Sequence, residues 1–142
     1  MPVRRAEATW HGDFKDGHGH MQFGDGKLEL DYSAGSRFEE DPGSNPEQVL
    51  GAAHAGCFSM ALASGLSKAG FPPEAIHTTA AVHLEKTEAG WTVTRIQLNT
   101  EAEVTGIKEA DFLEQAQKAK ANCPISRALG SVQIELEARL VA

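Results

Sequence analysis

Apolar and polar residues alternate along several stretches of the chain, which is the pattern of half-buried β-strands. A first strand is predicted over residues 6–10, and a hairpin over residues 20–33 turns at the Gly-Asp-Gly of residues 24–26. A second, longer hairpin covers residues 78–104, and a last strand covers residues 132–141. The pattern indicates antiparallel sheet built from hairpins.

A long apolar stretch in the middle of the chain predicts the helix around which the rest is organised. Asn45 can cap its start and Pro46 suits its first position, while Gly70, followed by two prolines, marks its end. Residues 48–67 contain no Asp, Glu, Lys or Arg, and a stretch of that length can span a membrane. Its three glycines, three serines and His54, with much of the apolar content only Ala, favour instead a helix buried on most sides in a globular core.

A second, amphipathic helix is predicted over residues 108–122, where Cys123 and Pro124 interrupt it before a short helical turn. Residues 34–44, between the first hairpin and the central helix, predict a polar loop. The order of strands, long helix, strands, helix and strand indicates an α+β fold with antiparallel sheet. The sequence shows no repeat and no linker, so we expect a single domain over residues 1–142.

Small residues along the central helix allow another backbone to approach it closely. They are Gly51, Gly56, Ser59, Ala63 and Ser64. The chain has only one other sizeable helix to place against the central one. Two copies of the central helix can pack together, so we expect a homodimer.

The acidic composition limits the classes of partner. With 13 Lys and Arg against 20 Asp and Glu, the net charge is −7, which argues against a nucleic acid partner. No apolar run follows the N-terminal arginines, so we expect no secretory signal, no membrane partner and a reducing cytoplasmic location, where a permanent disulfide is not favoured. The two cysteines form no Cys-x-x-Cys motif and are too few for a structural zinc site, so we expect neither metal nor cofactor.

The two cysteines occupy different local environments. Cys57 lies about eleven residues into the central helix, too far from the positive helix start for the dipole to help, and burial would raise its pKa. A reactive Cys57 thiolate would need a cation, for which His54 and Arg37 are the nearby candidates. Cys123 precedes Pro124 at a helix N-cap, where backbone N–H groups favour the thiolate. Local physics alone leaves open which cysteine reacts first.

Three histidines, His11, His18 and His20, gather in a glycine-rich stretch that also carries Asp13 and Asp16. Clustered His and Asp residues can bind a divalent metal ion. The glycines predict a flexible turn, and a flexible turn does not pre-form a site. We therefore interpret this stretch as a solvated turn.

Two segments carry recognisable motifs. They are RFEEDPGSNPEQVLGAAHAGCFSMAL, residues 37–62, and KAKANCPIS, residues 118–126. Together they resemble the OsmC/Ohr family of osmotically inducible and organic-hydroperoxide-resistance proteins, and the first segment looks closer to the OsmC branch. The resemblance covers essentially the whole chain. It implies an intertwined α+β homodimer, with antiparallel sheets around two long central helices and active sites at the subunit interface.

Taken residue by residue, the resemblance implies that Cys57 is the peroxidatic thiol and Cys123 the resolving thiol. It implies that Arg37 polarises the peroxide and holds the thiolate, and that Glu47 pairs with Arg37 to fix its guanidinium. Glu47 and Cys57 are ten residues apart on one helix, or about 15 Å along its axis. We therefore expect Glu47 and Arg37 to act on the partner's Cys57.

The resemblance implies a thiol-dependent peroxidase that reduces organic hydroperoxides in preference to hydrogen peroxide, through a Cys57 sulfenic acid and a Cys57–Cys123 disulfide. It implies an external dithiol reductant, of the lipoyl type, and requires no metal or haem. The apolar candidates for a substrate pocket are Phe38, Met60, Phe71 and Ile125. The alternative is a non-enzymatic, dimeric ligand-binding or stress protein of the same fold, with inert cysteines.

Overall fold

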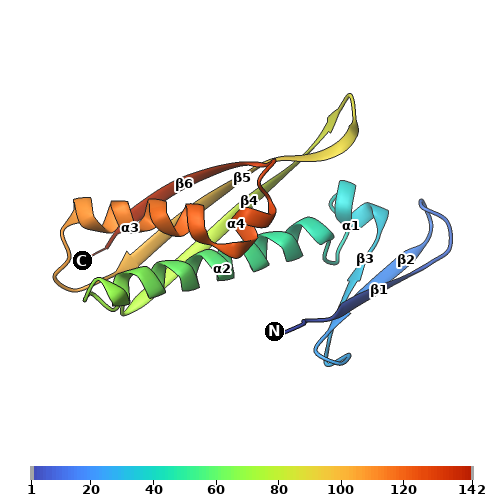
Figure 1. The fold of residues 1–142 in the computed structure, drawn as a ribbon. Coiled ribbons are helices and arrows are strands. Elements are labelled where there is room, and N and C mark those ends of the chain that lie inside the picture. Colours follow the sequence, from blue (N-terminus) through green and yellow to red (C-terminus); the bar gives the residue numbers. More distant parts are fainter. Residues whose placement is uncertain (1, 142) are drawn as a thin grey trace. The chain divides into compact units, whose positions relative to one another are not determined.

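The computed structural model describes residues 2–141 of the chain (Figure 1). The described residues form two three-stranded sheets and four helices, which confirms the predicted α+β class. The chain divides into an N-terminal unit, Met1–Val49, and a C-terminal unit, Leu50–Ala142, each with its own sheet. The boundary falls within the first turns of the longest helix, α2 (Pro46–Lys68).

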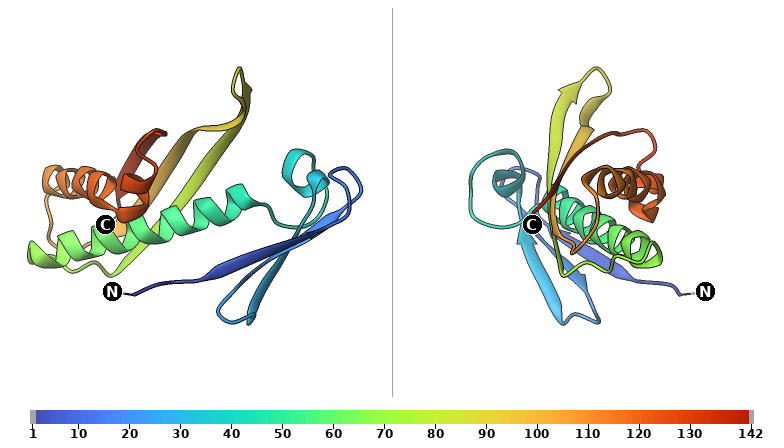
Figure 2. Two further views of the ribbon diagram at one scale, coloured as in Figure 1. Left: turned by 45° about the vertical axis from the view of Figure 1, so that its right-hand side comes forward. Right: turned by 90° about the vertical axis from the view of Figure 1, so that its left-hand side faces the viewer.

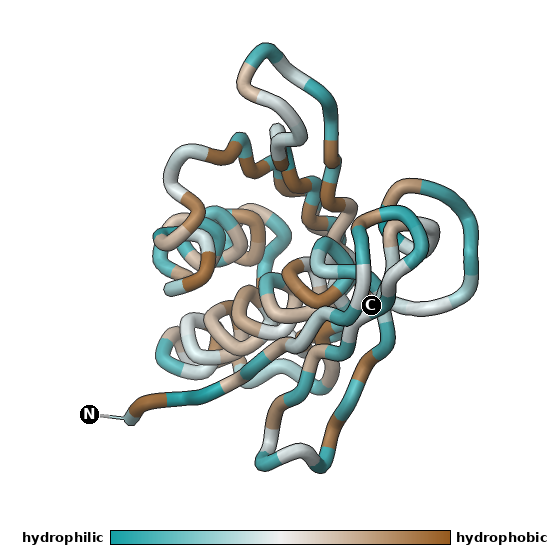
Figure 3. Tube along the Cα trace, turned by 90° about the vertical axis from the view of Figure 1, so that its right-hand side faces the viewer, coloured by the Kyte–Doolittle hydropathy of each residue, from teal (hydrophilic) through white to brown (hydrophobic). Residues whose placement is uncertain are grey.

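The sheet of the N-terminal unit is an antiparallel meander of β1 (Ala6–His11), β2 (His18–Phe23) and β3 (Leu28–Tyr32). Side chains alternate between an apolar and a polar face, and Figure 3 shows this alternation of hydropathy along the strands. The β2–β3 turn forms where the sequence predicts it. Asp25 has a φ of 60° there, between two glycines that also have positive φ, a conformation that glycine adopts without strain.

A short helix, α1 (Ala34–Phe38), replaces the first part of the polar loop predicted for residues 34–44, so that prediction is wrong for this segment. Its formation depends on hydrogen bonds rather than on apolar periodicity. Ser33 and Ser36 cap each other reciprocally, and the Ser36 hydroxyl also donates to the carbonyl of Ser44 at 2.7 Å. Such a turn of five residues carries no periodic signal in the sequence.

The sheet of the C-terminal unit has the order β4-β5-β6. β4 (Ala75–Thr87) and β5 (Gly90–Glu103) form the predicted antiparallel hairpin, but β6 (Gln133–Leu140) pairs with β5 in parallel. The expectation of purely antiparallel sheet is therefore wrong at this edge. The reason is the connection, because α3 (Glu109–Asn122) and α4 (Pro124–Ala128) cross from β5 to β6 and return the chain in the same direction.

Helices α2 and α3 cover one face of the β4-β5-β6 sheet (Figures 1 and 2). The core of this unit lies between the helices and the sheet. Its fully buried large side chains are Phe58, Leu62 and Leu66 from α2, Ile96 and Leu98 from β5, and Phe112 from α3. This layer positions the middle of α2 and the end of α3 beside each other.

Helix α2 begins and ends at the residues that the sequence indicates. The Asn45 side chain accepts a hydrogen bond from the Gln48 N–H at 2.8 Å, which is the N-cap interaction. At the other end Gly70 has a φ of 92°, and the Phe71 N–H donates to the carbonyl of Leu66 at 2.8 Å. The helix therefore ends in the left-handed turn that glycine favours.

Within the single chain, one side of α2 is buried, and burial of the helix on most sides stays a prediction. The buried stripe follows helical spacing at residues 51, 54, 58, 62 and 66. The other side is exposed at Gly56 and at Met60, whose exposed fraction is 77%. By length and composition α2 is the one helix among the described residues that could cross a membrane. However, one stripe of large side chains on α2 packs against a sheet, which is typical of a core helix in a globular protein.

Candidate active site

The two cysteines are free thiols, and their sulfur atoms lie 2.8 Å apart in the C-terminal unit. Cys57 projects from the middle of α2 and is half-buried. Cys123 is completely buried between α3 and α4. The fold thus brings together two residues that are 66 positions apart in the sequence.

The position of Cys123 follows from the break between two helices. Its N–H donates to the carbonyl of Ala119 at 2.9 Å and closes α3. Pro124 then occupies the first position of α4, where it needs no N–H partner. The Cys123 side chain is therefore held at the start of a new helical turn, whose free N–H groups face its sulfur.

The environment favours ionisation of Cys123. Burial opposes it, but hydrogen bonds to the Cys57 thiol and to the N–H and hydroxyl groups of Ser126 outweigh the effect of burial, and the Ile125 N–H adds to them. Together they hold the pKa of Cys123 below its usual range. This agrees with the inference from its place before Pro124.

The environment of Cys57 has the opposite effect. Burial raises the pKa of Cys57, and so does the hydrogen bond between its sulfur and that of Cys123. A hydrogen bond from the Ile125 N–H offsets part of this rise. Within the C-terminal unit, the surroundings therefore favour the thiolate form at Cys123 more than at Cys57, and Cys57 is the more accessible of the two.

His54 and Ser126 form a buried polar chain behind Cys123. The imidazole Nε2 of His54 lies 2.8 Å from the Ser126 hydroxyl oxygen. Because the Ser126 hydroxyl donates to the Cys123 sulfur, it accepts from His54, and the proton of the imidazole is on Nε2. Nδ1 of His54 is buried with no hydrogen-bond partner. Burial also lowers the pKa of His54, so this residue is neutral and does not act as the cation considered for Cys57.

The expected pair of Arg37 and Glu47 is present in the N-terminal unit. The guanidinium Nε and Nη2 atoms donate to the two carboxylate oxygens of Glu47, each at 2.9 Å. Arg37 lies in the last turn of α1 and Glu47 lies in the first turn of α2. This two-pronged geometry fixes the plane of the guanidinium and leaves its remaining N–H groups for another acceptor.

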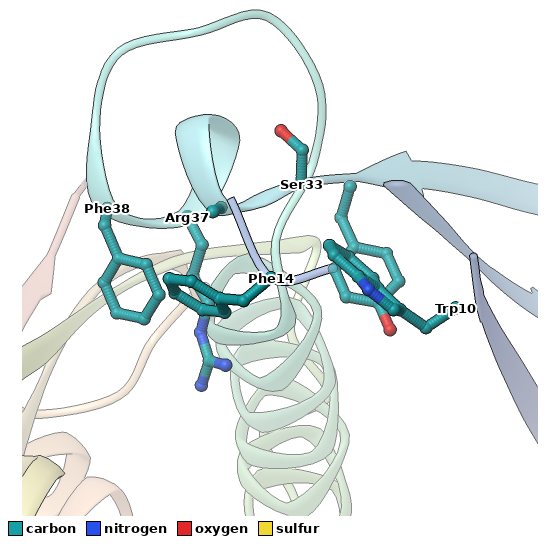
Figure 4. A pocket seen from close by; sticks show the side chains of 7 residues that line it. Trp10, Phe14, Ser33, Arg37 and Phe38 are labelled. Atoms are coloured by element: carbon teal, nitrogen blue, oxygen red, sulfur yellow. The ribbon is translucent and has the colours of Figure 1, made fainter. Parts of the chain in front are cut away.

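An aromatic cavity of about 330 Å³ lies beside Arg37 in the same unit (Figure 4). The side chains of Phe14, Phe38 and Trp10 line it, and the Arg37 guanidinium lies 5.2 Å from the Phe38 ring centroid. Of the pocket residues considered from the sequence, only Phe38 lines this cavity. Phe14 and Trp10 were missed. Alternation places Trp10 on the apolar face of β1, whereas nothing around Phe14 marks it.

The other three pocket candidates belong to the C-terminal unit. Met60 is exposed on α2, and Phe71 is half-buried against the core. Ile125 is half-buried on α4, and its N–H contributes a hydrogen bond to each cysteine. Among these three, Ile125 contacts the thiol pair through its backbone.

Comparison with known proteins identifies the family of this chain. The family model described as OsmC-like protein matches residues 39–137. The chain is 45% identical to Peroxiredoxin OsmC of Escherichia coli (strain K12) over 138 residues, which cover 96% of both proteins.

Solved structures agree with this match. An organic hydroperoxide resistance protein OsmC from Legionella pneumophila has a TM-score of 0.75 and 28% identity, covering 99% of this chain and 100% of that one. The organic hydroperoxide resistance protein OhrB of Bacillus subtilis has a TM-score of 0.71 and 26% identity, covering 94% of this chain and 97% of that one. The chain therefore belongs to the OsmC-like protein family, on its OsmC branch.

Proposed function

We propose that this protein is a thiol-dependent peroxidase that reduces organic hydroperoxides in preference to hydrogen peroxide. The observation that carries the proposal is the 2.8 Å approach of two free thiols, one half-buried and one completely buried. This arrangement suits a cycle in which the accessible sulfur is oxidised and the buried one then forms a disulfide with it. The peroxidase named among the relatives supports this chemistry.

The cycle begins when the Cys57 thiol loses its proton to solvent, which requires a nearby cation because the surroundings raise its pKa. The Cys57 thiolate then attacks the terminal oxygen of the hydroperoxide. The O–O bond breaks, the alkoxide leaves and takes a proton from solvent, and Cys57 becomes a sulfenic acid. The Cys123 sulfur then bonds to the Cys57 sulfur while the S–O bond breaks, and its proton leaves with the hydroxyl group as water. An external dithiol, of the lipoyl type, reduces the disulfide.

Arg37 is the cation proposed for the Cys57 thiolate, because His54 is neutral. A positive charge beside Cys57 would oppose the rise in its pKa and would polarise the bound peroxide. Glu47 would hold Arg37 through the two hydrogen bonds described above. Since Glu47 lies ten residues before Cys57 on α2, about 15 Å along the axis, we propose that the pair serves the partner's Cys57.

A homodimer is therefore part of the proposal, with each chain acting as a single OsmC-like domain over residues 1–142 in the cytoplasm. The exposed side of α2 carries small residues and Met60, which is a surface suited to a second copy of the helix. Mixing the inactive variants Cys57→Ser and Glu47→Ala tests the arrangement. Heterodimers with restored activity would support action across subunits, and mixtures without activity would count against it.

Intact mass spectrometry tests the cycle directly. Reduced protein is treated with one equivalent of an alkyl hydroperoxide and is measured without reductant. The wild type is expected to lose two hydrogens, and the Cys123→Ser variant to gain one oxygen, about 16 Da. Oxygen gained by Cys57→Ser instead would reverse the two roles. If neither mass changes, the alternative of a non-enzymatic ligand-binding or stress protein with inert cysteines replaces this proposal.

A further inference from the structure

Three histidines share the polar face of the N-terminal sheet, and the peroxidase chemistry uses none of them. His11 ends β1, and the register places it directly opposite His18 on β2. His20 follows two residues after His18, so both point to the same face. The glycine-rich composition around these residues suggests a flexible turn, but the structure places all three on paired strands. The objection that a flexible turn pre-forms no site therefore does not hold.

The three imidazole rings lie next to one another. Their centroids lie 5.5 Å apart for His11 and His18, 5.8 Å for His18 and His20, and 6.3 Å for His11 and His20. With metal–nitrogen bonds of about 2.1 Å and tetrahedral angles, the centroids of two ligating imidazoles lie about 5 Å apart. Metal binding would therefore require the three rings to move closer together and to turn one nitrogen each toward a common point.

Two carboxylates orient one of these rings. His20 Nδ1 lies 2.8 Å from Asp31 Oδ1 and 3.3 Å from Glu29 Oε1. A proton on Nδ1 donates to these carboxylates and leaves the lone pair of Nε2 for a metal ion. This is the carboxylate–histidine–metal arrangement that is typical of histidine ligands in metal sites. The ligand atoms of His20, Glu29 and Asp31 all lie within 4.8 Å of one another.

The surroundings supply space and negative charge. An open hollow borders the cluster, and it is lined by His11 and His18 together with Asp13 and Asp16. His11 and His18 are exposed and His20 is half-buried, so an ion can enter from solvent and keep a water ligand. Three protein nitrogens with one open position is a common coordination of zinc.

We propose that His11, His18 and His20 bind one divalent transition metal ion, with Asp31 orienting the His20 ring. Imidazole nitrogens select zinc, nickel or copper over magnesium or calcium, which prefer oxygen ligands. All residues of the proposed site belong to the N-terminal unit, whereas the two cysteines belong to the C-terminal unit.

Zinc titration of untagged, full-length protein by calorimetry tests the proposal. Thiolates also bind zinc, so the titration uses a Cys57→Ser, Cys123→Ser double variant. We expect one zinc ion per chain, no competition from excess magnesium, and loss of binding in His20→Ala and in His18→Ala. Asp31→Asn should weaken zinc binding about 10- to 100-fold, the usual effect of removing the partner of a histidine ligand. His83→Ala is the matched control and should leave the affinity unchanged.

Cobalt provides a second readout that does not depend on affinity alone. Its visible absorption bands report nitrogen ligation and coordination number, and they should change when His11 is replaced by Ala. Circular dichroism of each variant should match that of the parent protein if the sheet is intact. No zinc binding by the double variant would overturn the proposal. Binding that survives His20→Ala, or that magnesium competes for equally, would also overturn it.

Discussion

Replacing Ser126 with Ala tests the buried chain that joins His54 to Cys123. The hydroxyl of Ser126 is the partner of His54 Nε2 at 2.8 Å, and His54 Nδ1 already has no partner. Ser126→Ala therefore leaves both nitrogens of a completely buried imidazole without hydrogen bonds. Leaving one buried polar group unpaired costs about 1–3 kcal/mol of the free energy of unfolding. For a chain of this size that corresponds to a fall in Tm of about 3–12 °C.

The same substitution removes one of the hydrogen bonds that favour the Cys123 thiolate. We expect the pKa of Cys123 to rise, because burial then acts against fewer compensating donors. The ultraviolet absorbance of the thiolate, followed against pH in a Cys57→Ser background, measures this pKa without requiring a reagent to reach the buried sulfur. A slower conversion of the Cys57 sulfenic acid to disulfide should accompany the change in the Ser126→Ala enzyme.

Ser59→Ala is the matched control on α2. The Ser59 hydroxyl lies 2.7 Å from that of Thr78, and Thr78 keeps a second partner, the hydroxyl of Thr100 at 2.9 Å. This variant leaves no buried polar group without a hydrogen bond. It should therefore lower the free energy of unfolding by only about 0.5–1.5 kcal/mol and should not change the pKa of Cys123. The reasoning is refuted if Ser126→Ala unfolds at the same temperature as Ser59→Ala and titrates Cys123 as the wild type does.

Three further predictions concern pH, charge and assembly. Because burial lowers the pKa of His54, the unfolded chain binds more protons below pH about 6.5, and the free energy of unfolding should fall on acidification by up to about 1.4 kcal/mol per pH unit. Urea titrations between pH 5 and 8 should show that the free energy of unfolding depends less steeply on pH in His54→Asn than in the wild type. Arg37→Ala should lower kcat/KM for an alkyl hydroperoxide about 10²- to 10³-fold and leave the circular dichroism unchanged. Arg37→Lys should keep only part of the wild-type activity. A fully active Arg37→Ala enzyme would contradict the proposed role. If the proposed dimer forms through the exposed side of α2, Met60→Lys, at a position 77% exposed, should give a monomer in light scattering. Leu113→Lys on α3, 41% exposed, should not, and a dimer in both variants would place the interface elsewhere.

The sequence predicts the regular elements of this fold well because local rules determine them. Alternation identifies the hairpins, and Asn45 and Gly70 mark the ends of α2. The parallel pairing of β6 is not visible in the same pattern, because alternation is identical in parallel and antiparallel strands at a sheet edge. The sequence pattern also does not predict helix α1, because hydrogen bonds of two serine side chains stabilise it and no apolar stripe is present.

The candidate site is only partly predictable for a related reason. The motifs single out Cys57, Cys123, Arg37 and Glu47, but no spacing rule tells that a serine three residues after Cys123 accepts a hydrogen bond from a histidine 72 positions away. Such contacts depend on how α4 packs beside α2. The histidines on β1 and β2 are a case in which the sequence pattern is misleading. The glycines around them suggest a turn, whereas in the structure strand pairing fixes the positions of the histidines.

The separation of the two cysteines along the chain has a consequence for the stability of the oxidised protein. A Cys57–Cys123 bond would tie together residues 66 positions apart and enclose β4, β5 and α3 in one covalent loop. Closing a loop of that length removes unfolded-chain entropy worth about 4 kcal/mol. Each turnover would therefore pass through a form that resists unfolding and proteolysis more strongly than the resting enzyme. Peroxide load and the lifetime of the protein in the cell would rise together.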